Sequence, residues 1–315
     1  MFKVAVVLKT DESLRKILTD VCPEADYLWD AAVTEENIGE LDAVIGNIPP
    51  ALLKHAGKLK LLQLNTAGVN EYTTAPGIFA REDTALCSAV GAYGVVLSEY
   101  MVTAHLMLLK NMLLYRDNMK KPVWEPRNDV QTVFRSTVLV LGAGNIGRNY
   151  ALRVRAMGAK TIGIRRTPSP LPEFDEVYSM AELDRLLPEA DCVAMCLPAT
   201  PETVRVMTRE RLFRMKKGAV LVNAGRGNAV DPEGLYDALT SGHLRGAAID
   251  VTDPEPLPLT SPLWQVPNLL ITPHSAGGMR VRYTVERICE IAAHNLRAVM
   301  DGKIPEKTVD KNGGY

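Results

Sequence analysis

The sequence predicts an α/β protein of two domains, each built on a parallel β-sheet with helices on both faces. Short apolar runs alternate with helical patterns along most of the chain, which is typical of parallel sheets. The alternation occurs in two series, residues 2–65 and 137–273, separated by a long apolar segment and a loop rich in Pro and Trp. The length of 315 residues also suits about two domains, at roughly 150 residues for each.

The first series alternates strand and helix from the N-terminus onward. The expected buried strands are 2–8, 41–47 and 59–65, and the expected helices are 11–21 and 49–58. Residues 92–121 are expected to form mostly one long helix. This helix is too apolar for the surface of a single domain, so burial between domains or against another subunit would explain its composition.

The second series contains six strand candidates, which alternate with helical patterns. They are 137–141, 161–164, 191–197, 219–224, 246–251 and 269–273. Asp231 and Pro232 predict the start of a helix, as an N-cap acid and a first-turn proline. Ser179 and Glu182 have the spacing of a capping box. We expect the last helical stretch, 279–301, to return to the first domain.

Composition argues against several classes of protein. With 36 basic and 37 acidic residues the net charge is −1, so charge gives no reason to expect nucleic acid or membrane binding. No run approaches the roughly 20 apolar residues of a membrane span, and the N-terminus lacks the pattern of a signal peptide. The cytoplasm is therefore the expected location. The five cysteines have no zinc-site spacing, so we predict buried thiols and no metal site.

Three glycines in the stretch VLVLGAGNIG, residues 138–147, come between a predicted strand and a predicted helix. Gly142 permits a tight turn, Gly144 lets the backbone approach a pyrophosphate, and Gly147 lets helix and strand pack closely. Asn145 and Ile146 open the helix, whose free N–H groups and positive dipole end attract phosphates. In this context the pattern predicts a dinucleotide-binding, Rossmann-like domain, although a turn without any ligand would also fit it.

Two arginines occupy the region where such a domain normally has an acid that holds the cofactor's ribose hydroxyls. Arg165 and Arg166 follow the second strand of the series, and Thr167 comes next. A carboxylate there would repel a 2′-phosphate, whereas a guanidinium would bind it, often through two hydrogen bonds. We therefore expect a preference for NADP over NAD, and the alternative is that both arginines are ordinary solvated surface residues.

Three further polar residues follow predicted strands of the second series. Arg226 lies in VNAGRGNAVD, Glu255 in DVTDPEPLP and His274 in ITPHSAG. Ligands of open α/β sheets bind at the carboxyl ends of the strands, so the three side chains are candidates for one site. A structural role is the ordinary expectation for a lone histidine. The preceding proline, the strand end and a partner acid favour a functional role for His274.

This ordered set of motifs resembles the NAD(P)-dependent D-2-hydroxyacid dehydrogenase family. The match covers most of the chain and is most specific across 137–277, where the glycine loop is followed by LPATPET, NAGRGNAVD, DVTDPEPLPLTSPLW and TPHSAG. The resemblance implies a flavodoxin-like substrate domain, 1–98 plus 286–315, and a dinucleotide-binding domain, 99–285. It also implies an active site in the cleft between these domains, and a homodimer.

The resemblance gives each candidate a role in the chemistry. Arg226 would hold the substrate's carboxylate and carbonyl, and His274 would protonate the carbonyl oxygen as hydride arrives from the nicotinamide. Glu255 would hydrogen-bond His274 and keep it protonated near neutral pH. The chemistry supports this assignment, because an imidazole is a suitable proton donor near neutral pH and a guanidinium stabilises a developing alkoxide.

Other positions match the family's ligand contacts. Asp250 would contact the nicotinamide carboxamide, and Leu197 and Pro198 would line the adenosine side. Ala67 and Gly68, in the loop NTAGVN, would offer backbone N–H groups to the substrate's carboxylate.

Within the family, arginines after the second strand are typical of glyoxylate/hydroxypyruvate reductases. The sequence therefore predicts an enzyme that reduces small 2-oxoacids with NADPH, with NAD use still open. A dehydrogenase for a bulkier substrate is one alternative. Another is a binding protein, a cofactor-sensing corepressor of the same fold, because such proteins can retain the same three polar residues.

Overall fold

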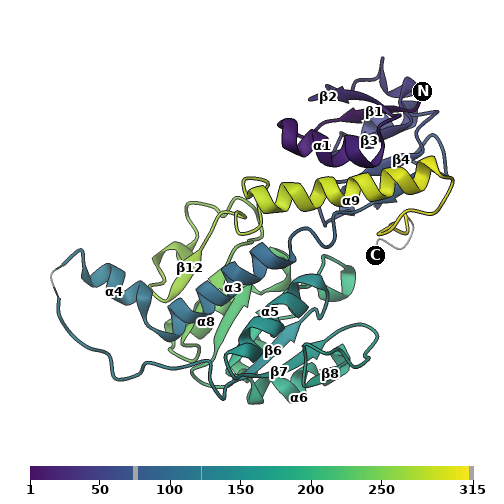
Figure 1. Ribbon diagram of the computed structural model, residues 1–315. Coiled ribbons are helices and arrows are strands. Elements are labelled where there is room, and N and C mark those ends of the chain that lie inside the picture. The colour runs from purple at the N-terminus through teal and green to yellow at the C-terminus, as the bar shows by residue number, and fades with distance from the viewer. Residues whose placement is uncertain (74–76, 122, 312–315) are drawn as a thin grey trace. The chain divides into compact units, whose positions relative to one another are not determined.

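The computed structural model describes residues 1–73, 77–121 and 123–311, and its contacts divide the chain into two compact units. The first unit consists of Met1–Tyr93 and Met279–Tyr315, and the second of Gly94–Gly278 (Figure 1). The C-terminal part of the chain therefore belongs with the N-terminal part. The predicted domain limits, at residues 98 and 285, stay a prediction.

A five-stranded parallel sheet with the order β2-β1-β3-β4-β5 forms the centre of the first unit. Its strands are β1 (Lys3–Val6), β2 (Asp26–Trp29), β3 (Ala43–Ile45), β4 (Leu61–Gln63) and β5 (Ala85–Cys87). The three predicted strands are confirmed as β1, β3 and β4. The other two strands, β2 and β5, were not predicted from the sequence, and they form the two edges of the sheet. β2 carries the exposed Leu28 and no buried residue, so it lacks the continuous apolar run of a central strand.

Two helices, α1 (Glu12–Val21) and α9 (Arg282–Met300), pack together on one face of this sheet (Figure 1). The predicted helix over 11–21 is confirmed as α1, and Asp11 caps it, because its carboxylate accepts the N–H of Leu14 at 3.0 Å. The opposite face is covered by α2 (Asn70–Thr73) and the 3-10 turns η1 (Ile38–Glu40) and η2 (Pro50–His55). The helix predicted over 49–58 is thus only the short turn η2, which Gly57 follows.

The second unit contains a seven-stranded parallel sheet with the order β12-β11-β10-β9-β6-β7-β8. Its strands are β6 (Thr137–Leu141), β7 (Lys160–Ile164), β8 (Glu176–Tyr178), β9 (Cys192–Met195), β10 (Val220–Asn223), β11 (Gly246–Ile249) and β12 (Leu269–Ile271). All six predicted strands are confirmed, and β8 is an additional edge strand. The strand order reverses beside β6, which is where ligands of such sheets bind.

Helices cover both faces of the second sheet, as predicted. α3 (Gly94–Leu109) and α5 (Asn145–Ala156) pack on the face that carries Val138 and Val140. Leu139 and Leu141 point to the other face, which α6 (Leu183–Leu186), α7 (Arg209–Arg214) and α8 (Pro232–Thr240) cover. The remaining elements are α4 (Met112–Asn118) and the 3-10 turns η3 (Met180–Glu182), η4 (Leu187–Glu189), η5 (Pro201–Thr203), η6 (Gly227–Ala229) and η7 (Pro262–Gln265).

The single helix predicted over 92–121 is wrong, because α3 ends at Leu109 and α4 begins at Met112. Asn111 between them has a left-handed backbone, with φ of 55°, which ends a helix. The guanidinium of Arg245 donates to Asn111 Oδ1 at 2.9 Å and to the carbonyl oxygens of Leu108 and Leu109 at 3.2 and 3.3 Å. A side chain distant in sequence therefore caps α3.

The capping box predicted from Ser179 and Glu182 does not form. The Ser179 side chain makes no capping hydrogen bond, and the carboxylate of Glu182 instead accepts Arg185 Nε at 2.7 Å. Within the described residues, no helix is long and apolar enough to cross a membrane.

Candidate active site

The glycine loop connects β6 to α5 through a tight turn. Gly142 has a φ of 99°, and a Cβ at this position would lie 2.7 Å from the carbonyl oxygen of Cys196. A Cβ on Gly147 would collide with the carbonyl oxygen of Gly142. Both glycines are therefore required by close backbone contacts, which join the loop to α5 and to the end of β9.

Gly144 differs from the other two glycines, because a Cβ there would meet nothing within 4 Å. It is the N-cap residue of α5, and it is exposed together with Asn145, while Ile146 is half-buried. The open backbone lies at the positive end of a helix dipole, where N–H groups have no partner within the helix. This cradle fits the pyrophosphate of a dinucleotide.

Arg165 directly follows the residue that holds the glycine loop. The carbonyl oxygen of Ile164 accepts the N–H groups of Gly142 and Ala143, both at 2.9 Å. Arg165 is half-buried and donates to Ser169 Oγ at 3.3 Å. Arg166 and Thr167 are exposed on the same turn. The turn therefore presents two guanidinium groups beside the glycine loop, where the second ribose of a bound dinucleotide would lie.

Leu197 and Pro198 follow β9 and lie between the glycine loop and the Arg226 turn. Leu197 is buried, and a Cβ on Gly225 would lie 2.8 Å from its carbonyl oxygen. Thr203 Oγ1 donates to the carbonyl oxygen of Pro198 at 2.7 Å, which fixes this segment.

Arg226 lies in a turn at the end of β10 that Asn223 holds in place. The buried Asn223 side chain accepts the N–H of Gly225 and donates to the carbonyl oxygen of Arg226, both at 3.0 Å. Arg226 is half-buried, and one guanidinium nitrogen, Nη1, donates to the carbonyl oxygen of Gly225 at 2.8 Å. Gly227 packs directly against the backbone of Thr252, so the Arg226 turn touches the start of the loop that carries Glu255.

The structure brings His274 and Glu255 together. His274 Nδ1 lies 3.0 and 3.1 Å from the two carboxylate oxygens of Glu255. A carboxylate can only accept, so Nδ1 carries the proton and Nε2 is the nitrogen left for a substrate. The side chains are 55% and 41% exposed, so a ligand can reach both of them.

Asp250 lies beneath the His274 turn and is almost fully buried, at 2% exposure. Its carboxylate accepts the hydroxyl of Thr272 at 2.6 Å and the N–H groups of Ser275 and Ala276 at 3.0 and 3.1 Å. For this residue the family resemblance predicts only a nicotinamide contact, which stays a prediction. The structure adds a role in holding the turn, and sequence reasoning also missed Asn223 and Thr272.

Ala67 and Gly68 follow β4 in the first unit, and both are half-buried. Their loop is held by Thr66 Oγ1, which donates to the carbonyl oxygen of Gly68 at 2.8 Å. The Tyr93 hydroxyl donates to the carbonyl oxygen of Asn65 at the start of the loop. This loop is a pre-formed turn with accessible backbone at the carboxyl end of its sheet.

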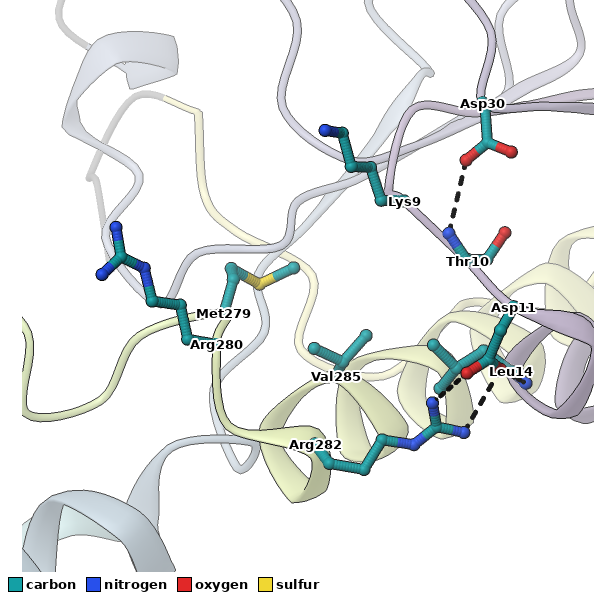
Figure 2. A pocket seen from close by; sticks show the side chains of 9 residues that line it. All are labelled: Lys9, Thr10, Asp11, Leu14, Asp30, Met279, Arg280, Arg282 and Val285. Carbon is teal, nitrogen blue, oxygen red and sulfur yellow. Dashed lines mark hydrogen bonds and ion pairs between the residues drawn. The ribbon is translucent and has the colours of Figure 1, made fainter.

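The first unit also contains a cavity of about 580 Å³ near the carboxyl ends of β1 and β2 (Figure 2). None of the predicted site residues lines it. Arg282 is paired with Asp11, whereas the side chains of Lys9 and Arg280 have no hydrogen-bond or ion-pair partner among residues 1–73, 77–121 and 123–311. The cavity is lined by Lys9, Thr10, Asp11, Leu14, Asp30, Met279, Arg280, Arg282 and Val285.

This chain is similar to known proteins over nearly its whole length. A family model described as "D-isomer specific 2-hydroxyacid dehydrogenase, NAD binding domain" matches residues 102–276. A glyoxylate reductase from Korarchaeum cryptofilum is 31% identical over 310 residues, which cover 96% of this chain and 84% of the relative.

Solved structures agree in fold over the full chain. A D-isomer specific 2-hydroxyacid dehydrogenase family protein from Aeromonas salmonicida has 32% sequence identity and a TM-score of 0.85, with 99% of each chain covered. An NADPH-dependent glyoxylate/hydroxypyruvate reductase from Sinorhizobium meliloti, solved with NADP and sulfate, has 28% identity and a TM-score of 0.84, with 100% of each chain covered.

Proposed function

The chain belongs to the D-isomer specific 2-hydroxyacid dehydrogenase family of NAD(P)-dependent oxidoreductases, and we propose that it reduces small 2-oxoacids to D-2-hydroxyacids with NADPH. The proposed substrates are of the glyoxylate and hydroxypyruvate type. The observation that carries the proposal is the His274–Glu255 pair, 3.0 Å apart, at the sheet edge that also carries the Arg226 turn and the glycine loop.

Each residue of the pair has one task in the proposed reaction. When bound, NADPH would supply a hydride to the carbonyl carbon of the 2-oxoacid. His274 donates the Nε2 proton to the carbonyl oxygen, so that the hydroxyl of the product is complete. Glu255 accepts Nδ1–H, which orients the ring and balances its positive charge.

Arg226 and the first-unit loop are proposed to hold the substrate. The guanidinium of Arg226 would bind the carboxylate and stabilise the negative charge that develops on the carbonyl oxygen. The backbone N–H groups of Ala67 and Gly68 would take the other side of the carboxylate.

The preference for NADPH is proposed from the turn after β7. Arg165 and Arg166 lie there, the stretch 148–164 that joins them to the glycine loop contains no Asp or Glu, and Thr167 adds a hydroxyl. A 2′-phosphate brings negative charge and acceptor oxygens that guanidinium groups bind through charged hydrogen bonds. The relative from Sinorhizobium meliloti is NADPH-dependent, which supports the same choice here.

The first-unit cavity favours one alternative, a longer 2-oxoacid with a second anionic group. Figure 2 shows Lys9 and Arg280 extending from the two sides of the cavity. Met279 lines the cavity, and its sulfur lies 3.9 Å from the Tyr93 hydroxyl oxygen. The same hydroxyl donates to the carbonyl oxygen of Asn65, at the start of the loop that contains Ala67 and Gly68. A distal carboxylate on the substrate would therefore have two cations available.

A homodimer is proposed from apolar side chains that the second unit leaves exposed. Trp124 is 99% exposed, Met119 is 83% exposed and Phe134 is 57% exposed, and α4 between α3 and this segment has no buried residue. Large apolar side chains that are left exposed are typical of a protein interface. A second copy of the chain is the proposed partner, as in the family that the sequence resembles.

Initial rates with a panel of 2-oxoacids test the proposed function. We expect rapid loss of NADPH absorbance with glyoxylate or hydroxypyruvate. The longer substrate would be favoured if a dicarboxylic 2-oxoacid is reduced fastest. In that case Lys9→Met/Arg280→Met should lower the rate with the dicarboxylic 2-oxoacid alone. If NADPH binds but no 2-oxoacid of the panel is reduced, the corepressor-like binding protein would be favoured instead.

A further inference from the structure

We propose that Tyr100 and Thr272 are positioning residues that hold the His274 turn in its reactive conformation through Asp250. The inference rests on the proposed function, because it concerns the proton donor of that reaction. It involves four side chains from three segments of the second unit, α3, the end of β11 and the turn after β12.

The His274 turn needs to be held, because its backbone is in an unfavourable region. His274 has a φ of 47°, where residues with a Cβ are uncommon outside special turns. Without external contacts a turn of this kind would relax, and the imidazole would move away from Glu255. The contacts that prevent this movement therefore determine where Nε2 points.

Asp250 supplies most of these contacts. Its backbone carbonyl oxygen accepts the N–H of His274 at 2.8 Å, and its carboxylate accepts the N–H groups of Ser275 and Ala276. One buried residue therefore binds three consecutive N–H groups of the turn, on both sides of the reactive side chain. A carboxylate that receives several hydrogen bonds is itself firmly oriented.

Thr272 and Tyr100 extend this arrangement into α3. Thr272 Oγ1 lies 2.6 Å from Asp250 Oδ1 and 2.8 Å from the Tyr100 hydroxyl oxygen. The Thr272 hydroxyl has one proton, which it donates to the carboxylate. Tyr100 is therefore the donor to Thr272, so the hydrogen bonds run in one direction, from Tyr100 to Thr272 to Asp250.

The protonation state of Tyr100 and the packing of its helix suit this role. Burial raises the pKa of Tyr100 to about 12, so the phenol remains a donor throughout the neutral range. α3 also packs against β10 and β11, the strands that precede the Arg226 turn and Asp250. A rigid helix on the same sheet thus anchors the first member of the chain.

Tyr100→Phe tests the proposal, because it removes only the donor hydroxyl. We expect kcat for the best 2-oxoacid to fall by about five- to tenfold, as for one lost hydrogen bond. The KM for the 2-oxoacid and the dissociation constant of NADPH should stay within about twofold, because Tyr100 is not one of the residues proposed to bind either ligand. The double variant Tyr100→Phe/Thr272→Val should lose no more than Thr272→Val alone, since both substitutions break one chain of contacts.

Two controls separate positioning from a general loss of structure. Tyr236→Phe makes the same chemical change on α8 and should leave kcat unchanged. Thr272→Ser keeps a hydroxyl and should restore most of the kcat that Thr272→Val loses. If Thr272→Val fails to fold, Tyr100→Phe and its control still decide the question.

The proposal is wrong if Tyr100→Phe matches Tyr236→Phe in kcat. It is equally wrong if the loss in kcat comes with a matching loss in NADPH binding and thermal stability. These outcomes differ from a failure of the proposed function, in which the unaltered protein itself would show no turnover.

Discussion

Glu255 accepts Nδ1–H of His274, so Nε2 is the nitrogen that remains for the substrate. If Nε2 is the proton donor, His274→Gln should lower kcat by about 10²- to 10⁴-fold, the usual contribution of a general acid. Binding of NADPH should change little. The measurement is the steady-state rate together with an NADPH titration.

His294→Gln is the matched control, because His294 is exposed on α9 of the first unit and is not one of the predicted site residues. It should retain full activity. Unchanged turnover in His274→Gln would remove His274 from the reaction.

Arg165 and Arg166 carry the cofactor preference in this account. Charged hydrogen bonds contribute about 1.5–3 kcal/mol each, so Arg165→Ala/Arg166→Ala should raise the NADPH dissociation constant by about ten- to a thousandfold. NADH binding should stay nearly constant, because NADH has no 2′-phosphate. Fluorescence titration of both cofactors measures the difference, with Arg214→Ala as a control on the surface of α7. Equal weakening of both cofactors would contradict the role of the two arginines.

At the scale of residues, local patterns predicted much of the candidate site. The glycine loop, the two arginines and the Arg226, Glu255 and His274 segments are each recognisable in a short stretch of sequence. The Tyr100–Thr272 contact could not be predicted in this way, because 172 positions separate the partners. Asp250 was associated with the cofactor alone, since only the folded turn reveals the N–H groups that it accepts.

The strand–turn–helix element from β6 to α5 contains two glycines, Gly144 and Gly147, whose substitution should have different effects. Gly147→Ala should lower the free energy of unfolding by about 1–3 kcal/mol, because the new Cβ would collide with the carbonyl oxygen of Gly142. Gly144→Ala meets no atom within 4 Å and should leave stability unchanged. The same methyl group would obstruct the pyrophosphate and raise the NADPH dissociation constant by about tenfold or more.

Chemical denaturation and NADPH titration of the two variants test this distinction. Equal effects of Gly144→Ala and Gly147→Ala on both properties would argue against a phosphate cradle at Gly144.

The packing of α3 against α5 contains a buried histidine that makes stability depend on pH. His105 Nδ1 lies 2.8 Å from the Tyr150 hydroxyl, and burial lowers the pKa of His105 from 6.5 to about 4. The unfolded chain therefore takes up this proton first as pH falls. The contribution of neutral His105 to the free energy of unfolding is complete above pH 6.5. It is lost as the pH falls from 6.5 to about 4.

Relative to His105→Gln, the free energy of unfolding of the natural sequence should fall by about 3 kcal/mol across that range. Denaturation of both proteins at several pH values measures the difference. Parallel pH dependence in the two proteins would mean that His105 is not held neutral.

At the scale of elements, the sequence predicted the central strands of both sheets and the edge strand β12, but not the edge strands β2, β5 and β8. Strands such as β1 and β10 are apolar runs because both faces are covered, whereas the edge strands β2 and β8 contain no buried residue. The break between α3 and α4 depends on the contact of Arg245 with Asn111. The sequence does not reveal this contact, because 134 positions separate the two residues.

At the scale of the whole molecule, the exposed apolar segment after α4 predicts self-association. Trp124→Asp/Phe134→Asp should convert a dimer into a monomer, because it places charge within an apolar interface. Ile304→Asp changes an equally exposed apolar residue of the first unit and should leave the dimer intact. Sedimentation analysis at micromolar concentration measures both, and a monomeric natural sequence would contradict the proposal.

The central claim is that this family member is a 2-oxoacid reductase whose arginines select NADPH. The most direct test compares kcat/KM of the unaltered protein with NADPH and with NADH, using the same saturating 2-oxoacid. We expect turnover with a ratio of at least about tenfold in favour of NADPH. Equal use of both cofactors would contradict the role of Arg165 and Arg166, and the absence of turnover with either would contradict the proposed reaction itself.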